Sequence, residues 1–486
     1  MSYENEVKKE YRTYQIDIKK GHKLYQYFDE ICLNSNNLYN ITNFYIRQVY
    51  TALNQVKELQ PLQKEVMDTI RNNLQKMNDI QSNAYLKKLQ KEALKPKEKR
   101  KEIKKNLFGL PTKENSFLGY NFLDCLFKTM KQKDYYSLPG QIKQQVLQNV
   151  VQNWKSYFVS LKDYKIHPEK YSRRPSIPGY LPKGGRKETI LSNRICKIKE
   201  GKYLKFPKTK FQLNIGKLAH LNGRFQQVRI IPKYDSFTVE LVIFNGEKAE
   251  VLAKKERCMG IDLGLDNIGT VISNSGMTPI LFKGGIIKSI NQWYNKMRSH
   301  YYAILRNGKK NHDGSFQSKR LIELDKYRYR KVKDFLHKVS FNIIKIAKEN
   351  KIDTIVIGKN EHWKQEVHLG KKNNQNFVQI PHCLLIELIT YKANSEGIAV
   401  ILTEESYTSK AIFLDKDDIP TYQSGNTMKH IFSGKRISRG MYRTKNLLLI
   451  DADVNGAANI LRKVIPKAFT NGIAAVCSTP QVVNVR

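Results

Sequence analysis

The spacing of hydrophobic residues in the first half of the chain changes twice. Residues 11–18 alternate between polar and apolar and predict a strand, whereas after Gly21 apolar side chains recur three and four positions apart, as in an amphipathic helix. Helical spacing continues through most of 38–150, and another helix is expected after 138–140. Residues 189–257 return to strand patterns, with a hairpin over 225–244. The order is therefore β, helical, β.

From Met259 onward the pattern is that of an α/β domain. Three strands are expected first, followed by a long helix with Phe335, Val339 and Ile343 on one face. Residues 354–358 and 398–402 form short apolar strands separated by a helix around 378–396. A polar stretch of roughly forty residues precedes the last helix, which begins near Asp453. This order predicts a mixed sheet flanked by helices.

Composition adds a strong charge signal to this picture. The 486 residues include 85 Lys and Arg against 44 Asp and Glu, a net charge of +41, and 40% of the chain is hydrophobic. Such a length predicts two or three domains with real cores. Since so large a positive excess opposes compaction, a polyanion is the expected partner, and a small neutral molecule as sole partner is excluded.

The cysteines and the apolar segments point to a protein of the cytosol. Six scattered cysteines form no CxxC pair and no zinc-finger spacing, so they are expected to be reduced thiols, mostly buried. The chain has neither a signal-like apolar run near Met1 nor a stretch of membrane-spanning length. We therefore expect a cytoplasmic protein, in the prokaryotic cytosol or nucleoid, with no membrane partner.

Two basic segments in the first half are candidates for phosphate contact. Residues 171–187 combine Pro and Gly with Arg173, Arg174 and Lys183 and with interleaved tyrosines, which suits stacking on bases beside bound phosphates. A structured linker explains that segment equally well. Residues 87–105 are strongly basic around Pro96 and fit either a phosphate-tracking surface or a solvated one.

Acidic residues of the second half fall at the ends of predicted elements. Asp262 alternates with Ile261 and Leu263, so its carboxylate points away from those apolar side chains, where burial costs several kcal/mol unless a cation compensates. Asp453 lies at the start of the last helix, where a helix cap is the simpler alternative role. Acidic side chains that converge in a basic protein indicate a site for Mg²⁺ or Mn²⁺, which prefer oxygen ligands.

Several motifs together resemble the TnpB family, the transposon-encoded, RNA-guided relatives of the type V CRISPR effectors. The carrying segments are GIDLGLDN (260–267), EESYTS (404–409) and DADVNGAANILRK (451–463), supported by LPGQIKQQVLQNVVQNWKSYF (138–158), RPSIPGYLPK (174–183) and NNQNFVQIP (373–381). The resemblance runs from about residue 10 to the carboxy terminus. Its weight comes from the order and spacing of these motifs.

The resemblance implies an α/β multidomain protein with an RNase H-like RuvC domain, preceded by a β-barrel wedge-type domain with a helical recognition insert. The implied boundaries are 1–20 and 160–257 for the wedge-type domain and 21–159 for the insert. Residues 258–405 and 447–486 would form the RuvC nuclease domain, and 406–446 a basic insert that binds target nucleic acid.

The resemblance also implies which acids are catalytic and metal-binding. Asp262 corresponds to the first catalytic aspartate and Asp453 to the last, whereas Asp451 is expected to be structural. Relatives usually carry the second acid at the end of the strand 354–358, where this chain has Gly358. Glu405, at the end of a neighbouring strand, is favoured as its replacement, and Glu361 is the alternate.

A second departure concerns zinc. Many relatives have CxxC pairs between the YTS motif and the last aspartate, but residues 409–446 contain no cysteine, so no structural zinc is expected. Packing around aromatic residues such as Phe413 and Tyr442 must hold this stretch instead. Its basic side chains suit phosphate contact, although an ordinary basic loop is the alternative. These side chains are Lys435, Arg436, Arg439 and Arg443.

The resemblance thus implies an RNA-guided, divalent-metal-dependent DNA endonuclease encoded by a transposable element, with Mg²⁺ or Mn²⁺ (two ions) as cofactor. Its partners would be a guide RNA and target DNA, both double-stranded and single-stranded. Two alternatives stay open: a nuclease-deficient RNA-guided DNA-binding regulator, and a DNA transposase that acts without guide RNA. The sequence leaves open whether the protein is a monomer or a dimer.

Overall fold

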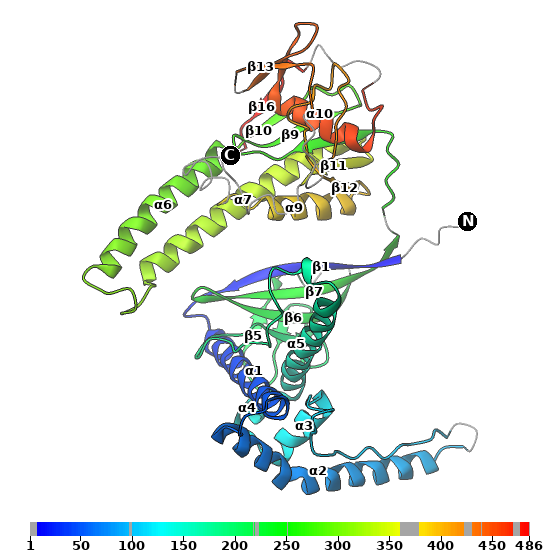
Figure 1. Cartoon of the computed structure of the whole chain (residues 1–486), viewed down its shortest axis with the longest axis vertical. Coiled ribbons are helices and arrows are strands. Elements are labelled where there is room, and N and C mark those ends of the chain that lie inside the picture. Colours follow the sequence, from blue (N-terminus) through cyan, green and yellow to red (C-terminus); the bar gives the residue numbers. More distant parts are fainter. Residues whose placement is uncertain are drawn as a thin grey trace. The chain divides into compact units, whose positions relative to one another are not determined.

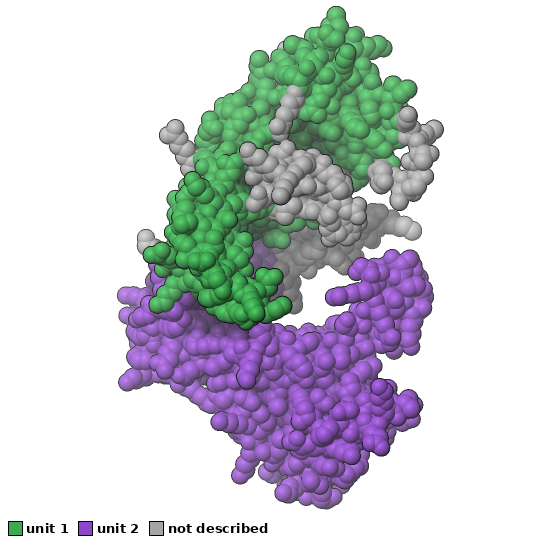
Figure 2. All heavy atoms as spheres, turned by 60° about the vertical axis from the view of Figure 1, so that its left-hand side comes forward, with its two compact units in different colours: residues 1–6, 249–486 green, residues 7–248 purple. Residues whose placement is uncertain are grey.

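The computed structural model describes residues 7–96, 100–216, 218, 223–249, 251–359, 379–421, 430–438, 440–469 and 477–485. The chain divides into two compact units, one formed by residues 7–248 and the other by the residues from 249 onward (Figure 2). Each unit has its own apolar core. The finer domain boundaries expected from the sequence stay predictions.

Two antiparallel sheets form the β part of the first unit. The larger one has the strand order β1-β7-β6-β2, so the amino-terminal strand lies in one sheet with strands more than 170 residues later. The expected hairpin is confirmed, because β6 pairs with β7 from Arg224↔Phe244 to Lys233↔Ser236. The smaller sheet has the order β3-β4-β5. The strands are β1 (Val7–Ile18), β2 (Thr189–Ser192), β3 (Lys197–Lys199), β4 (Tyr203–Lys205), β5 (Gln212–Asn214), β6 (Arg224–Lys233) and β7 (Ser236–Ala249).

Helices make up the stretch between β1 and β2, as the sequence predicts. The helices are α1 (Tyr25–Asn54), α2 (Pro61–Ala93), α3 (Tyr120–Thr129), α4 (Lys133–Ser137), α5 (Gly140–Ile166) and the short η2 (Pro168–Lys170). The long helices α1 and α5 pack together, and the buried Trp154 indole donates a 2.8 Å hydrogen bond to Asn43 Oδ1 between them. Helix α2 ends at Ala93, before Pro96, whose ring cannot be accommodated in a helix interior.

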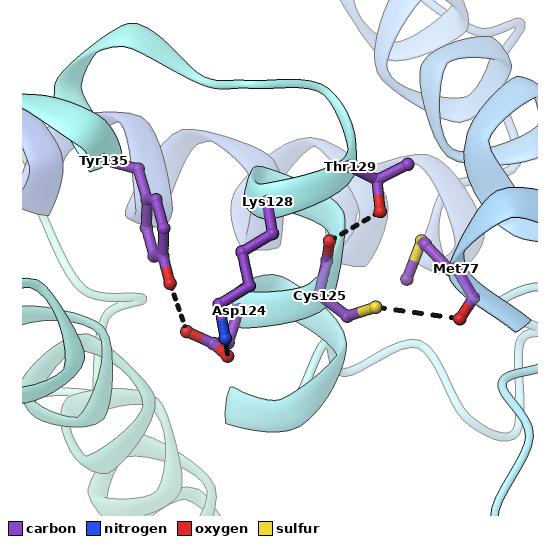
Figure 3. Close-up of polar contacts among 6 residues, drawn as sticks. All are labelled: Met77, Asp124, Cys125, Lys128, Thr129 and Tyr135. Atoms are coloured by element: carbon purple, nitrogen blue, oxygen red, sulfur yellow. Dashed lines mark hydrogen bonds and ion pairs between the residues drawn. The ribbon is translucent and has the colours of Figure 1, made fainter. Parts of the chain in front are cut away.

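A group of polar contacts fixes α3 against its neighbours (Figure 3). The Tyr135 hydroxyl of α4 donates to Asp124 Oδ1 at 2.6 Å, and Lys128 forms an ion pair with the other carboxylate oxygen at 2.5 Å. The Cys125 thiol donates to the Met77 carbonyl of α2 at 3.8 Å. Cys125 therefore acts as a buried structural thiol, and burial raises its pKa.

The second unit is built on a six-stranded mixed sheet of order β12-β11-β8-β9-β10-β16. Strands β12, β11 and β8 run parallel, β9 is antiparallel to both β8 and β10, and β16 is parallel to β10. The predicted mixed sheet is thus confirmed. The elements are β8 (Cys258–Asp262), β9 (Asn267–Ser273), β10 (Ile280–Lys283), α6 (Gly285–Arg306), α7 (Lys319–Glu349), β11 (Thr354–Gly358), α9 (His382–Ser395), β12 (Ala399–Thr403), β13 (Lys435–Ser438), β14 (Met441–Arg443), β15 (Leu449–Asp451), α10 (Ala452–Val464) and β16 (Gln481–Val483).

The helices lie on opposite faces of this sheet (Figure 1). Met259, Ile261 and Leu263 of the β8 region share a core with α7 and α9. The alternate residues of β8 face α10, and Gly260 permits a very close approach, because a Cβ there would lie 2.5 Å from the Ala457 carbonyl oxygen. A side chain at position 260 would therefore push α10 off the sheet.

Two expectations about the second unit are corrected. The segment before β11 contains two helices, α6 and α7, rather than one, because a turn near Gly308 and Gly314 separates them. The polar stretch before α10 contains the three-stranded antiparallel sheet β13-β14-β15. Across the described ranges, no helix combines the length and the apolar character that crossing a membrane requires.

Candidate active site

Asp262 is the last residue of β8 and lies under α10. Because side chains alternate along a strand, Asp262 shares the α10 face with Gly260, opposite Ile261 and Leu263. Its Oδ2 lies against the α-carbon of Gly456, where any Cβ would collide with it. The glycine of the DVNG segment therefore makes room for the carboxylate between strand and helix.

Asp453 lies in the first turn of α10, and a different residue caps the helix. Asp451 is the N-cap, since its Oδ1 accepts hydrogen bonds from the N–H groups of Asp453 (2.9 Å) and Val454 (3.1 Å). The structural role expected for Asp451 is what the structure shows, and the capping alternative for Asp453 is wrong. Asn267, at the start of β9, donates to Asp453 Oδ2 at 2.5 Å. The Asp453 carboxylate is thereby held toward β8 and β9.

Glu405 occupies the space that a side chain at position 358 would fill. Strands β11 and β12 pair in parallel with Gly358 opposite Thr403, and Lys359 N–H donates to the Thr403 carbonyl at 2.7 Å. A Cβ on Gly358 would lie 2.6 Å from both Cγ and Oε1 of Glu405. The missing acid at the end of β11 is therefore matched by an acid from the adjacent strand end.

The three acids are coupled through Asp262. Burial, and after it the charge of Asp453, raises the pKa of Asp262 to about 7. Burial, and after it the charge of Asp262, raises the pKa of Glu405 to about 8. Asp262 thus interacts with both other acids, and the raised pKa values of Asp262 and Glu405 mean that these two carboxyls resist ionisation until a positive charge arrives.

Carboxylate oxygens are the ligands that Mg²⁺ and Mn²⁺ prefer, so Asp262, Glu405 and Asp453 are the donors that could hold such an ion. Within the residues that the structure describes, no group of three or more His, Cys, Asp or Glu side chains has the convergent geometry of a preformed metal site. The chemistry of the donor set and the mutual repulsion therefore fit a divalent cation, and its binding requires the carboxylates to turn toward one another.

A polar stripe on α10, which the sequence analysis missed, anchors the loop that carries Glu405. Asn459 Nδ2 donates to the carbonyls of Thr408 (2.9 Å) and Ala411 (2.6 Å), and Asn455 Nδ2 also donates to Ala411 (2.7 Å). Thr408 in turn donates from N–H and hydroxyl to the Glu405 carbonyl, at 3.2 and 2.8 Å. The spacing of two asparagines by four residues in a helix of small residues is the signal that could have revealed this stripe.

The other candidate acids have separate positions. Glu404 forms an ion pair with Lys463 of α10 and accepts a hydrogen bond from Ser406 N–H at 2.7 Å, so it is engaged away from Asp262. Glu361, the alternate for the third acid, lies outside the described residues. The choice between Glu405 and Glu361 stays a prediction, which the position of Glu405 favours.

The predicted nucleic-acid contacts lie in both units. In the first unit Arg173, Arg174 and Lys183 are exposed in the extended segment that follows η2. In the second, Lys435 and Arg443 are directly opposite each other on β13 and β14, and the Arg436 guanidinium lies 5.5 Å above the Tyr442 ring. Arg439 lies outside the described residues.

The basic hairpin connects directly to the helix that carries Asp453. Strand β14 pairs with β15, and β15 ends at the cap residue Asp451. The Ala452 N–H, at the start of α10, donates to the Gly440 carbonyl at 2.9 Å. Phe413 and Tyr442 are buried in one cluster with α10, which confirms the aromatic packing expected for this stretch.

Two family models match the second half of the chain. The model OrfB_IS605, described as a probable transposase, matches residues 242–364. The model of the Cas12f1-like TNB domain matches residues 382–460. Residues 242–364 and 382–460 are therefore similar to a transposase family and to the Cas12f1-like proteins, which confirms the resemblance to the TnpB family seen in the sequence.

Comparison with solved structures gives distant likenesses. A Cas12f1–sgRNA–target DNA complex is 12% identical, with 93% of this chain and 100% of the other covered and a TM-score of 0.30. A CRISPR-Cas12f ternary complex is 13% identical, with 82% and 81% covered and a TM-score of 0.31. C2c1 of Alicyclobacillus acidoterrestris with single-guide RNA is 9% identical, with 88% and 70% covered and a TM-score of 0.32. No curated protein matches the chain.

Proposed function

We propose that this protein is an RNA-guided endonuclease that hydrolyses DNA phosphodiesters at Asp262, Glu405 and Asp453 with the help of divalent metal ions. The observation that carries the proposal is the position of three acids beside α10: Asp262 Oδ2 lies against Gly456, Glu405 fills the volume beside Gly358, and Asp453 lies in the first turn of the helix. The raised pKa values of Asp262 and Glu405 agree with this placement. Support also comes from the strand order β12-β11-β8-β9-β10, which suits an RNase H-like RuvC domain, and from the matched families.

Each residue of the site has a specific task in this reaction. Two Mg²⁺ or Mn²⁺ ions would supply an activated water and stabilise the leaving oxygen. Asp262 would bind between the other two acids, since it is the one that couples to both. Asn267 orients Asp453 through its hydrogen bond, which leaves the other carboxylate oxygen for an ion. Asp262 and Glu405 are half-buried, which limits the screening of their charges by bulk water.

Guide RNA and target DNA would supply the polyanions that the charge of +41 requires. Base pairing between guide and target would select the sequence, and the protein would recognise the backbone of the hybrid and a short flanking motif. The basic hairpin β13-β14, continuous with α10, is suited to hold a DNA strand near the acids because of Lys435, Arg436 and Arg443.

Cleavage of a plasmid target by the purified ribonucleoprotein with Mg²⁺ tests this function. Asp262→Asn should reduce cleavage about 1,000-fold or more, equivalent to ~4 kcal/mol of transition-state stabilisation, and leave RNA binding unchanged. The matched control is Asp266→Asn, since Asp266 is an exposed neighbouring acid paired with Lys288, and its cleavage should stay near wild type. Undiminished cleavage by Asp262→Asn contradicts the site.

A transposase that acts without guide RNA is the second candidate, favoured by the description of the family that matches residues 242–364. It would use the same acids for strand transfer between DNA ends. Strand transfer by protein stripped of RNA would support this candidate. Cleavage that depends on added RNA would support the guided nuclease, and RNA-dependent DNA binding without cleavage would support a regulator.

A further inference from the structure

The small sheet β3-β4-β5 of the first unit has one apolar face and one strongly basic face. The register places Ile198, Leu204 and Leu213 in one row across the sheet, and Leu204 and Leu213 are buried. Every other residue of these strands therefore lies on the opposite face. That face, which we call the lysine face, consists of Lys197, Lys199, Tyr203, Lys205, Gln212 and Asn214.

In the free protein, repulsion between the lysines of this face lowers the stability of the fold. Lys197 and Lys205 are directly opposite each other in the antiparallel pair, an arrangement of like charges that destabilises a sheet. Among the described residues, no carboxylate forms an ion pair with Lys197, Lys199 or Lys205. A bound polyanion would remove this repulsion, because phosphates placed over the face would meet three ammonium groups.

A cavity of about 470 Å³ adjoins the lysine face and lies within the same unit. This volume falls in the range of ~300–1,000 Å³ typical of small-ligand sites. Its walls include Tyr203, Gln212 and Asn214 of the lysine face together with Phe211, Lys210 and His22. Phe211 is 38% exposed, with the Lys210 ammonium 5.7 Å from the ring centroid. One wall can therefore stack on a flat ring while a cation stands beside it.

Polar groups in the cavity are oriented by hydrogen bonds of their own. His22 Nδ1 accepts from the Leu24 N–H at 3.1 Å, so in the neutral ring Nε2 carries the proton and acts as donor. Burial, with a smaller effect of Lys23, lowers the pKa of His22 and favours that neutral ring. Asn214 Oδ1 accepts from the Gly216 N–H at 2.9 Å, so this side chain contributes its amide donor.

Helix α1 contacts the chain segment that leads to one wall of the cavity. The Tyr27 hydroxyl donates to the Pro207 carbonyl at 2.7 Å, and the buried rings of Phe28 and Phe206 pack edge to face with centroids 5.1 Å apart. These contacts fix the connection between β4 and β5, which carries Phe211. The site is thereby preorganised, and binding does not have to order it.

We propose that this cavity binds one unstacked nucleotide of a single-stranded RNA segment, with its base on Phe211 and the neighbouring phosphates on the lysine face. Proteins read RNA mainly at single-stranded positions whose bases leave the stack and contact aromatic and amide side chains. The histidine and amide donors beside the ring suit a base edge and a ribose hydroxyl. The inference rests on the proposed function, in which the guide RNA supplies the strand.

Direct RNA binding tests the cavity without reference to cleavage. Labelled single-stranded RNA and DNA of the same mixed sequence are titrated with wild type, Phe211→Ala and the control Tyr136→Ala, an exposed aromatic residue of the same unit with Lys143 over its ring. We expect Phe211→Ala to weaken RNA binding about five- to tenfold and Tyr136→Ala by less than about twofold. Unchanged melting temperatures verify that both variants fold.

Two further measurements complete the test. The variant Lys197→Gln/Lys205→Gln should lower the slope of log K against log salt by about 1.4, since each phosphate contact on a single strand contributes about 0.7. Crosslinking of thiouridine-substituted RNA to the wild type should label the peptide that contains Tyr203 and Phe211.

The outcomes separate this site from the proposed function. If the wild type binds RNA and Phe211→Ala binds it as tightly as Tyr136→Ala, the assignment of the cavity as a nucleotide site is wrong, and the proposed RNA-guided function is unaffected. If Phe211→Ala weakens DNA binding as much as RNA binding, the assignment to RNA is wrong. A wild type that binds no RNA overturns both.

Discussion

Gly358 and Glu405 show how one absent side chain shapes the candidate site. The end of β11 lies beside the end of β12, so the two positions compete for one volume under α10. With glycine at 358, the Glu405 side chain extends across that volume toward Asp262, whose charge contributes to its raised pKa. A carboxylate at the neighbouring strand end thus reaches the place where the family resemblance implies an acid.

Gly358→Ala should displace Glu405, because the new Cβ would lie 2.6 Å from Glu405 Cγ and also 2.6 Å from Ile460 Cδ1. We expect a loss of ~1–3 kcal/mol in unfolding free energy from overpacking, and a fall of about 10- to 100-fold in cleavage rate from the misplaced acid. Gly269→Ala is the control in the same sheet, since its Cβ would find no atom closer than 3.8 Å. Equal rates for the two variants would argue against a role for Glu405.

At the scale of elements, α10 does more than present Asp453. Its small residues allow it to approach β8 closely at Gly260, and its asparagines bind the carbonyls of the loop that follows Glu405. The helix therefore sets the positions of acids from β8, from the β12 end and from its own first turn. The basic hairpin β13-β14 is joined to the same framework through β15.

Asn459→Ala removes two buried hydrogen bonds to this loop. We expect a stability loss of ~1–3 kcal/mol, because the Thr408 carbonyl loses its donor inside the protein while Ala411 keeps the one from Asn455. The cleavage rate should fall by about tenfold through the loosened Glu405. Chemical denaturation and single-turnover cleavage measure the two effects. Asn342→Ala, on the exposed face of α7, is the control and should change neither. Full activity in a destabilised Asn459→Ala protein would show that the loop does not position Glu405 for cleavage.

Prediction from sequence succeeded where a local pattern determines the structure. The alternation of residues around Asp262 predicted the face of the strand on which its side chain lies. The helix that contains Asp453 was also expected from the sequence. Glu405 was expected to substitute at Gly358 because it follows a neighbouring strand, but the close contact between the two depends on the register of strands more than forty residues apart, which no local pattern determines. Strands β13 to β15 were missed since each has only three or four residues, too few for alternation to be recognised. Strand β13 is exposed throughout, and β14 and β15 each bury one residue, Tyr442 and Ile450.

At the scale of the whole molecule, the charge of +41 is spread over both units. The first unit carries the lysine face and the exposed Arg173 and Arg174, and the second carries the basic hairpin. Repulsion within each group weakens the folded state until a polyanion binds. The stability of the folded protein should therefore depend on whether a polyanion is bound.

Removal of RNA should lower the melting temperature, most clearly at low salt. RNA at about 100-fold above its dissociation constant would stabilise the folded protein by ~2.7 kcal/mol. The gap between RNA-bound and RNA-free protein should shrink toward 1 M salt, where the screening length falls to ~3 Å. Scanning calorimetry on both forms measures this gap. Equal melting temperatures at low salt would count against a large RNA interface.

The central claim is that the carboxylates of residues 262, 405 and 453 share divalent ions. Anomalous diffraction from crystals soaked in Mn²⁺ tests it most directly, because the signal locates the metal without reference to activity. We expect an anomalous peak bounded by these three side chains, absent from Asp262→Asn crystals soaked in the same way. Manganese bound only elsewhere, with the three carboxylates unliganded, would contradict it.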